Sequence, residues 1–516
     1  MAKKEKKKVD KNKLKKVKVE ETEVSEVVEK DIKKDVKKNK KLRINKKNVL
    51  VLCCILFVIF LIITIISVYK SGVHEYPIIY KGKNNYLYLL KDGDKKEDAV
   101  VFSRRDGIGY ISFFNNNPRY FLYKKSTDLY IYDVKKLEDK KIISDYSASF
   151  VTNNDEYVVA VDKVGVMYSY NLDGELKEIG NDLFGDVAFT DDCILYENSN
   201  DELYLSYLNG KEKDILIATE VNSYQFSKDG SKVVYINKDD ELISYVIKSK
   251  KSNTINKNVS EFYCDSDSCD QIYYVASGDE EDIFFYNGKK SSLYEKGVNE
   301  LEAVDVDANI MLFSRKEDNS YKLYIKNGNK NSVLIDDSYG VNGISKIFDA
   351  KYVYYVNTKK ELKYYNISKK TKKDLESNIS GRFILSKNGY YVFGSLNSVG
   401  DGTLYYLSED KITKVNDNVY SFNYYYLNKE GDKLYYYKDY SNKIASLYVF
   451  DGNKSSLISD DVYMYQYIND KLIYFIKDYD VVNMVGDLYK FDGKEKVMIT
   501  NNVQSLVQFN INQYRK

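Results

Sequence analysis

The chain has 516 residues, of which 43% are hydrophobic and 30% charged, so it is long enough for several folded domains. It contains one His, His74, which excludes a zinc site built from several His and leaves His74 as the sole base for a Ser-His or Cys-His mechanism. The net charge is +2, but the charges are unevenly distributed, because residues 1–47 hold 20 Lys and Arg against 9 Asp and Glu. The rest of the chain is therefore net acidic and lacks the basic surface expected of a nucleic-acid-binding protein.

Residues 1–47 form a tail dominated by Lys and Glu without any aromatic residue. A segment of this composition buries too little apolar surface to fold, so we predict a mostly disordered cytoplasmic tail. An alternative for part of it is an amphipathic helix, because Val24, Val28, Ile32 and Val36 are spaced by four. The basic side chains next to the following apolar segment are predicted to contact lipid headgroups: Lys37, Lys38, Lys40, Lys41, Arg43, Lys46 and Lys47.

Residues 48–69 are predicted to be a transmembrane helix. Residues 49–68 are uncharged, and 16 of these 20 are Val, Leu, Ile or Phe, enough to cross a bilayer of about 30 Å. A cleaved signal peptide and a lipoprotein are poorer explanations, because no small-residue cleavage site follows and Cys53 and Cys54 lie near the start of the run. The basic N-terminal flank predicts a cytoplasmic N-terminus. The chain is therefore expected to be a single-pass cell-membrane protein, with residues 70–75 as linker and residues 76–516 outside the cytoplasm.

A short phrase recurs through residues 76–516, and its clearest copy is Leu488-Tyr489 followed by Asp492-Gly493. The intervals between copies are 36 to 43 residues. Each unit contains four short runs of strand-forming residues separated by turn formers, which is the pattern of a four-stranded antiparallel propeller blade. The second residue of each copy, eleven in all, stands at positions 88, 130, 168, 204, 243, 284, 324, 363, 405, 448 and 489.

Eleven blades exceed the four to eight of an ordinary β-propeller. We therefore predict an all-β region of two propellers, of five and six blades, with a single large ring as the alternative. The first unit begins at its second strand and an extra strand remains at residues 505–511, so we expect this C-terminal strand to complete the first blade.

Two of these units carry motifs of known propeller families. The run from Phe226 through Lys228-Asp229-Gly230 to Tyr235 resembles the TolB-like turn, and Tyr354 to Leu362 resembles the phrase of receptor-type Tyr-rich propellers. The resemblance covers roughly residues 76–511. It implies a membrane-anchored bacterial surface protein that binds a protein or ligand outside the cytoplasm, and it specifies no activity.

The segment between Cys264 and Asp270 departs most from the repeat. Cys264 and Cys269 could form a disulfide in an oxidising compartment. Asp265, Asp267 and Asp270 are weak candidates for a calcium site made of oxygen ligands. The third interpretation is an ordinary polar turn, because the segment aligns with the Lys228-Asp229-Gly230 turn of the preceding unit.

The sequence predicts neither a catalytic centre nor a cofactor. We expect a binding or scaffolding module that docks a protein, a peptide or a cell-envelope glycan on a propeller face. The alternatives are an envelope glycan hydrolase or lyase that uses only carboxylates, and a structural subunit of an envelope complex.

Overall fold

The computed structural model describes residues 76–91, 99–104, 108–212, 214–276, 281–341, 343–422 and 425–509. The predicted tail with its headgroup-contacting Lys and Arg residues, the predicted span and the linker all lie outside these ranges and stay predictions. Residues 73–516 form one compact unit. Every element within the described ranges is a strand, and none of them is a helix that could cross a membrane.

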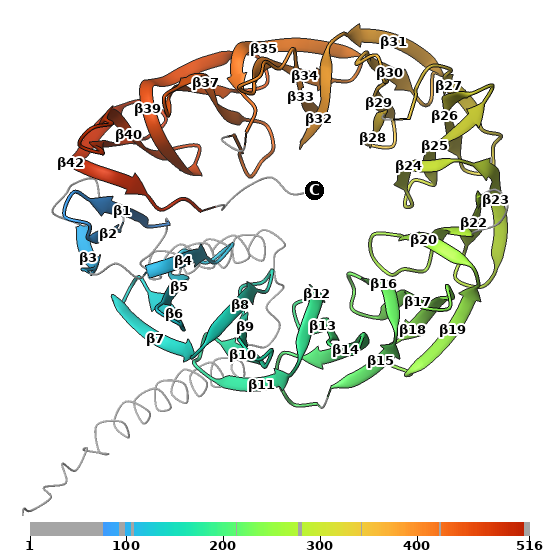
Figure 1. The fold of residues 1–516 in the computed structure, drawn as a ribbon, viewed down its shortest axis with the longest axis horizontal. Coiled ribbons are helices and arrows are strands. Elements are labelled where there is room, and N and C mark those ends of the chain that lie inside the picture. The colour runs from blue at the N-terminus through green and yellow to red at the C-terminus, as the bar shows by residue number, and fades with distance from the viewer. Residues whose placement is uncertain are drawn as a thin grey trace, which may run out of the picture. The chain divides into compact units, whose positions relative to one another are not determined.

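The described strands form eleven antiparallel four-stranded blades arranged around a ring (Figure 1). Blades 2, 3 and 4 consist of β4 (Ile108–Phe113), β5 (Tyr120–Lys125), β6 (Asp128–Asp133), β7 (Glu138–Ile143), β8 (Tyr146–Val151), β9 (Tyr157–Asp162), β10 (Met167–Asn171), β11 (Leu176–Gly180), β12 (Leu183–Phe189), β13 (Cys193–Asn198), β14 (Glu202–Tyr207) and β15 (Ile215–Thr219). Blades 5 and 6 consist of β16 (Val221–Phe226), β17 (Lys232–Asn237), β18 (Leu242–Val246), β19 (Lys251–Asn256), β20 (Val259–Cys264), β21 (Ile272–Ala276), β22 (Glu281–Tyr286) and β23 (Ser291–Val298).

In blades 2 to 11 the first strand in chain order is the innermost and the fourth is the outermost. Blades 7, 8 and 9 consist of β24 (Glu300–Asp305), β25 (Ile310–Glu317), β26 (Ser320–Asn327), β27 (Val333–Asp336), β28 (Ile344–Phe348), β29 (Tyr352–Val356), β30 (Leu362–Asn366), β31 (Thr371–Glu376), β32 (Ile379–Ser386), β33 (Gly389–Gly394), β34 (Asp401–Ser408) and β35 (Lys411–Tyr420). Blades 10, 11 and 1 consist of β36 (Tyr426–Leu427), β37 (Leu434–Ser441), β38 (Ile444–Phe450), β39 (Ser455–Asn469), β40 (Leu472–Asp480), β41 (Val485–Phe491), β42 (Lys496–Leu506), β1 (Ile78–Gly82), β2 (Leu87–Leu90) and β3 (Ala99–Ser103).

Three long strands each pair with strands of two blades: β42, β39 and β35, the last through Val419 opposite Lys438 of β37. The first part of β42 pairs with β41 as the outer strand of blade 11, and its last part pairs with β1 as the innermost strand of blade 1, with Tyr80 opposite Leu506. β39 joins blades 10 and 11 in the same way. The C-terminal strand predicted at residues 505–511 is therefore not a separate element, because the residues that pair with β1 are the end of β42.

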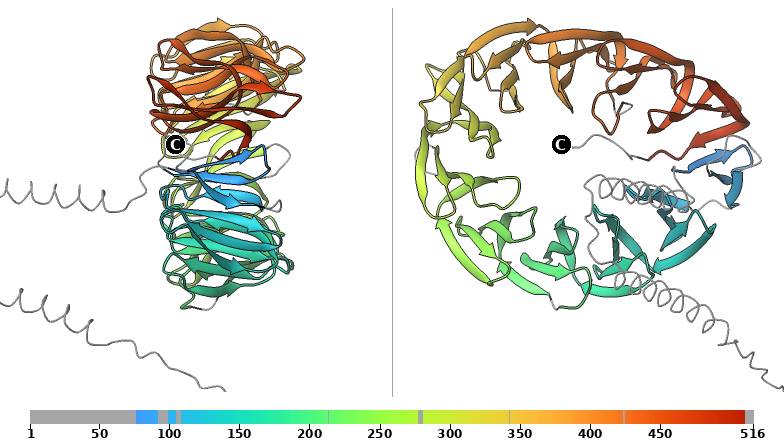
Figure 2. Two further views of the ribbon diagram at one scale, coloured as in Figure 1. Left: turned by 90° about the vertical axis from the view of Figure 1, so that its left-hand side faces the viewer. Right: turned by 180° about the vertical axis from the view of Figure 1, so that it is seen from behind.

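The prediction of two propellers is wrong, because each blade packs on the next in a single closed ring. Successive side chains of a strand point to opposite faces. In β17, Val233 and Tyr235 pack against blade 4, whereas Val234 and Ile236 pack against blade 6. One hydrophobic cluster joins blades 11, 1 and 2, and the others join each further neighbouring pair. No break remains at which a five-blade ring could close on itself, and the blades form a single layer when seen edge-on (Figure 2).

The recurring phrase lies on the third strand of each blade and has a packing role. Its first residue has no exposed surface in ten of the eleven blades described, Leu129 and Leu488 among them. Its second residue stacks on an aromatic ring of the second strand in seven blades, as in the pair Phe475–Tyr489, whose ring centroids lie 5.6 Å apart. Such cross-strand aromatic pairs stabilise a sheet, which explains the 53 Tyr of the sequence.

A β-bulge accompanies the phrase in every described blade. The fourth strand carries one extra residue there; in blade 11, for example, Leu488 pairs with Thr500 and Tyr489 with Met498, which leaves Ile499 between them. The extra residue is apolar in all eleven cases and packs between blades: Phe102, Ile142, Ile179, Ile217, Ile255, Tyr294, Ile335, Leu375, Val415, Ile458 and Ile499. A bulge increases strand twist, so it turns an apolar side chain of the outer strand into the core.

Candidate functional site

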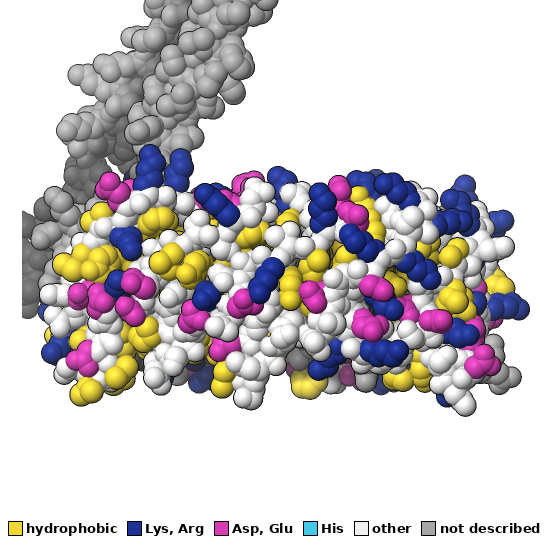
Figure 3. Space-filling model, turned by 90° about the horizontal axis from the view of Figure 1, so that it is seen from above, with side chains coloured by type: hydrophobic (Ala, Val, Ile, Leu, Met, Phe, Trp, Pro, Cys, Tyr) yellow, Lys and Arg dark blue, Asp and Glu magenta, His cyan; other side chains and the backbone are white. Residues whose placement is uncertain are grey.

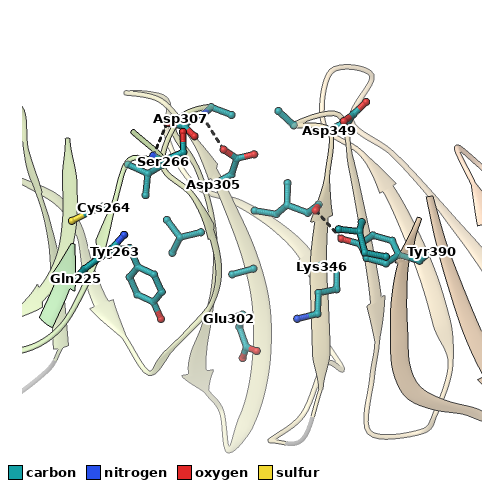
Figure 4. A pocket seen from close by; sticks show the side chains of 17 residues that line it. Gln225, Tyr263, Cys264, Ser266, Glu302, Asp305, Asp307, Lys346, Asp349 and Tyr390 are labelled. Carbon is teal, nitrogen blue, oxygen red and sulfur yellow. Dashed lines mark hydrogen bonds between the residues drawn. The ribbon is translucent and has the colours of Figure 1, made fainter. Parts of the chain in front are cut away.

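A groove of about 930 Å³ crosses the innermost strands of blades 5 to 9 (Figure 4). Five consecutive repeats contribute to its lining, and it is therefore elongated along the ring. Its polar side chains include Gln225, Glu302 and Lys346, and its rings include Tyr263 and Tyr390. Ala303, Val304, Ile347 and Leu385 supply apolar surface between them.

The groove exists because innermost strands are covered on fewer sides than second strands. β24 has no fully buried residue, whereas five of the eight residues of the adjacent β25 are buried. The sequence reflects this difference, since β24 reads Glu-Leu-Glu-Ala-Val-Asp and β25 begins with four large apolar residues. Polar and apolar groups thus alternate on the wall that faces the ring axis.

Glu302 is the most perturbed carboxyl group of the groove. Burial raises its pKa to about 7, the nearby charge of Glu300 adds to the effect, and a hydrogen bond from Tyr339 (Oη to Oε2, 2.8 Å) opposes it. In Figure 4 the side chains of Glu302 and Lys346 lie at the same level of the groove on neighbouring strands. Near neutral pH this wall therefore presents a carboxyl group that exchanges readily between its neutral and charged forms.

Replacing Glu302 with Gln is expected to stabilise the protein at alkaline pH. The folded-state pKa lies above that of the unfolded chain, so wild-type stability falls as pH rises from about 4.5 to 7 and is then constant. We expect the melting temperature of Glu302→Gln to exceed that of the wild type at pH 8 and to approach it at pH 5. Glu430→Gln, at an exposed turn residue of blade 10, is the control. A difference in melting temperature between the wild type and Glu302→Gln that stays the same from pH 5 to pH 8 would contradict the assignment.

Asp265 holds the turn of the Cys264–Asp270 segment, and Asp270 connects this turn to the preceding blade. Asp265 Oδ1 accepts hydrogen bonds from the backbone N–H groups of Ser268 (2.8 Å) and Cys269 (3.1 Å), and Oδ2 accepts one from Gln271 (2.7 Å). Asp270 forms an ion pair with Lys232 of blade 5. These contacts do not bring Asp265, Asp267 and Asp270 together as ligands, and the described residues contain no group of three or more acidic, Cys or His side chains suited to a metal.

Cys264 and Cys269 are free thiols that lie next to each other. A hydrogen bond between them, together with burial, raises the pKa of the Cys264 thiol. Cys264 also contributes to the lining of the groove (Figure 4). Cys193, at the start of β13, is buried as well.

Polar contacts connect the turns that follow the innermost strands of successive blades. Asp155 of blade 3 accepts hydrogen bonds from backbone N–H groups of Asn115 and Asn116 in blade 2. Ser266 N donates to Asp307 Oδ1 of blade 7 over 3.2 Å. The contact with the most hydrogen bonds joins blades 10 and 11 and is centred on Asp470. Its carboxylate accepts hydrogen bonds from Lys433 (Nζ, 2.6 Å), Tyr435 (Oη, 3.0 Å), Tyr467 (Oη, 2.9 Å) and Asn428 (Nδ2, 3.2 Å). The sequence did not reveal these contacts, because each partner looks like an ordinary turn or strand residue of its own repeat.

No protein-family model and no curated protein matches the sequence. Solved structures match at low identity. A structure described as a eukaryotic initiation factor is 11% identical, with a TM-score of 0.41, over 75% of this chain and 97% of its own. The tricorn protease is 13% identical (TM-score 0.27; 84% of this chain, 58% of its own), and Porphyromonas gingivalis dipeptidyl peptidase 4 is 10% identical (TM-score 0.37; 64% and 66%). The propeller architecture of this chain rests on its strand order, described above.

Proposed function

We propose that the protein is a membrane-anchored binding module of the bacterial cell surface, related to TolB-like propellers, whose groove holds an extended peptide or a cell-envelope glycan. The observation that carries the proposal is the shape of the groove, which follows five consecutive innermost strands. A polymer can extend across several repeats, whereas a compact small molecule would occupy one or two. The half-buried ring of Tyr263 provides a stacking surface, while Gln225, Glu302 and Lys346 provide hydrogen-bonding groups and charge.

The predicted anchor supports a surface location. Residues 49–68 are long and apolar enough to span a bilayer, and the basic tail before them favours a cytoplasmic N-terminus. The propeller would then be displayed outside the cytoplasm, where peptides and envelope glycans are accessible.

Binding can be tested with the full-length protein in detergent on arrays of envelope glycans and peptides, followed by calorimetry on the hits. We expect the double variant Gln225→Ala/Lys346→Ala to weaken binding at least tenfold, because it removes two of the groove's polar contacts. The matched control is Lys359→Ala, an exposed residue of the β29–β30 turn outside the groove. Binding that is unaffected by the double variant would contradict the assignment of the groove.

A carboxylate-dependent glycan hydrolase or lyase is the second candidate, and one observation favours it. The raised pKa of Glu302 is suitable for a general acid. Such an enzyme needs a second carboxylate close to the first, but the other carboxylates that line the groove, Asp305, Asp307 and Asp349, lie at its upper end in Figure 4, away from Glu302. Binding without turnover is therefore the better supported function.

A further inference from the structure

Exposed lysines occupy the turns between the third and fourth strands of four consecutive blades. We name as the lysine arc Lys248 and Lys250 of blade 5, Lys289 and Lys290 of blade 6, and Lys369 and Lys370 of blade 8; Lys330 lies between them in blade 7. None of these seven forms an ion pair with any residue in the described part of the chain. Unpaired positive charge thus follows the outer rim across four blades.

The lysine arc lies on the face at which the described chain begins. Because the strands are antiparallel, turns between strands 3 and 4 share a face with turns between strands 1 and 2. Tyr76 belongs to this face, since its hydroxyl donates to the carbonyl oxygens of Phe114 (2.8 Å) and Asn115 (2.7 Å) in such a turn of blade 2. Six residues, 70–75, separate Tyr76 from the end of the predicted span at residue 69, and the seven steps between these two Cα atoms reach at most about 25 Å.

Two acidic groups on the same face lie closer to the ring axis and are already engaged. Asp229 accepts hydrogen bonds from Ser227 Oγ (2.8 Å) and Ser231 N (2.9 Å), and Asp270 is paired with Lys232. Figure 3 looks onto the edge of the ring that is uppermost in Figure 1, and Lys and Arg side chains lie along both rims of that edge, more of them along one rim than along the other. The unpaired charge of this face is therefore concentrated on its outer rim.

We propose that the lysine arc lies against anionic lipid headgroups of the extracytoplasmic leaflet. The lysines stand at turn tips of one face and do not line the groove described above, an arrangement that fits a flat anionic surface better than a single polymer strand. The chain would enter the propeller on the side that meets the bilayer, which leaves the opposite face open. This inference rests on the membrane anchor of the proposed function.

The test uses the full-length protein reconstituted into nanodiscs of phosphatidylcholine alone or with 30% phosphatidylglycerol. Acetylation of individual lysines is followed by mass spectrometry. We expect the lysine arc to react at least fivefold more slowly in the anionic discs, and 0.5 M NaCl to abolish the difference. Lys359 and Lys443, on turns of the opposite face, are the controls and should react equally in both discs.

Each result decides a different point. Equal reactivity of the lysine arc in the two discs, with the protein inserted in both, overturns the lipid contact and leaves the anchor intact. Failure to insert into either disc overturns the anchor and the lipid contact together. If soluble polyphosphate protects these lysines in detergent while anionic discs do not, the partner is a soluble polyanion and the proposal is wrong. In a variant with all six lysines of the arc changed to Gln, anionic discs should no longer slow the acetylation of Lys330.

Discussion

Truncation of the chain after Asn502 is expected to lower its melting temperature by at least about 5 °C, because the ring can then no longer close. The truncation removes the pairing of β42 with β1 and the hydrogen bond from Val507 N to Ile79 O (2.8 Å). It also removes the ring of Phe509, whose centroid lies 4.0 Å from that of Phe113. Burial of a Phe or Leu side chain contributes about 1.5–3 kcal/mol, and both Leu506 and Phe509 are buried.

A buried amide adds to this cost. Gln466 is 2% exposed, its Nε2 donates to Phe509 O (2.8 Å), and its Oε1 accepts from Phe509 N (2.9 Å). Without Phe509, Oε1 and one N–H of this amide lose their partners, while the hydrogen bond from Nε2 to Tyr467 O (2.8 Å) remains. A group left unsatisfied costs about 1–3 kcal/mol. The summed loss is a large part of the roughly 5–15 kcal/mol that stabilises an ordinary domain.

The control for this experiment is truncation after Phe509, which keeps every contact just named. We expect its melting curve, followed by circular dichroism or differential scanning fluorimetry, to match that of the full-length chain. Matching curves for both truncations would show that β42 does not hold the ring closed. Gln466→Leu provides a finer test, and we expect a loss of about 1–3 kcal/mol for it.

The blade pattern was readable from the sequence because it is local. Each phrase such as Leu488-Tyr489 carries its own alternation and turn, so the all-β class and four-stranded blades were predicted correctly. The number of rings was not readable, because it depends on the angle between neighbouring blades. Val233 and Val234 look alike in the sequence whether the blade they contact belongs to a ring of five or of eleven.

The bulges were missed although the sequence contains their signal. An apolar residue such as Ile142 or Ile499 follows the phrase by ten to fourteen residues in every unit, at the bulge of the fourth strand. The groove had no comparable signal. Gln225, Glu302 and Lys346 come from three different repeats, and each resembles an ordinary polar residue of a half-exposed strand until the ring places them on one wall.

Replacing Asp470 with Ala is expected to destabilise the protein by about 2–4 kcal/mol. Its carboxylate joins Lys433 and Tyr435 of blade 10 to Tyr467 of blade 11, and the two Tyr are 3% and 2% exposed. Breaking a buried ion pair costs about 3–5 kcal/mol. We lower this value because the side chains of Lys433 and Asp470 are 36% and 29% exposed, so water screens part of their attraction.

The pH dependence of stability distinguishes the contribution of the Asp470 charge from that of the shape of its side chain. Burial alone would raise the pKa of Asp470, but the hydrogen bonds from Lys433, Tyr467 and Tyr435 outweigh it and hold the pKa below its ordinary value. The contribution of the charge is thus complete above about pH 4 and is lost as pH falls through the folded-state pKa. We expect the stability advantage of the wild type over Asp470→Asn, measured by urea unfolding, to be constant from pH 5 to 7 and to shrink below pH 4. Asp318→Asn, at a side chain that is 95% exposed, should change stability little at any pH. An advantage over Asp470→Asn that persists undiminished at pH 3 would mean that the geometry of this turn, and not its charge, holds blades 10 and 11 together.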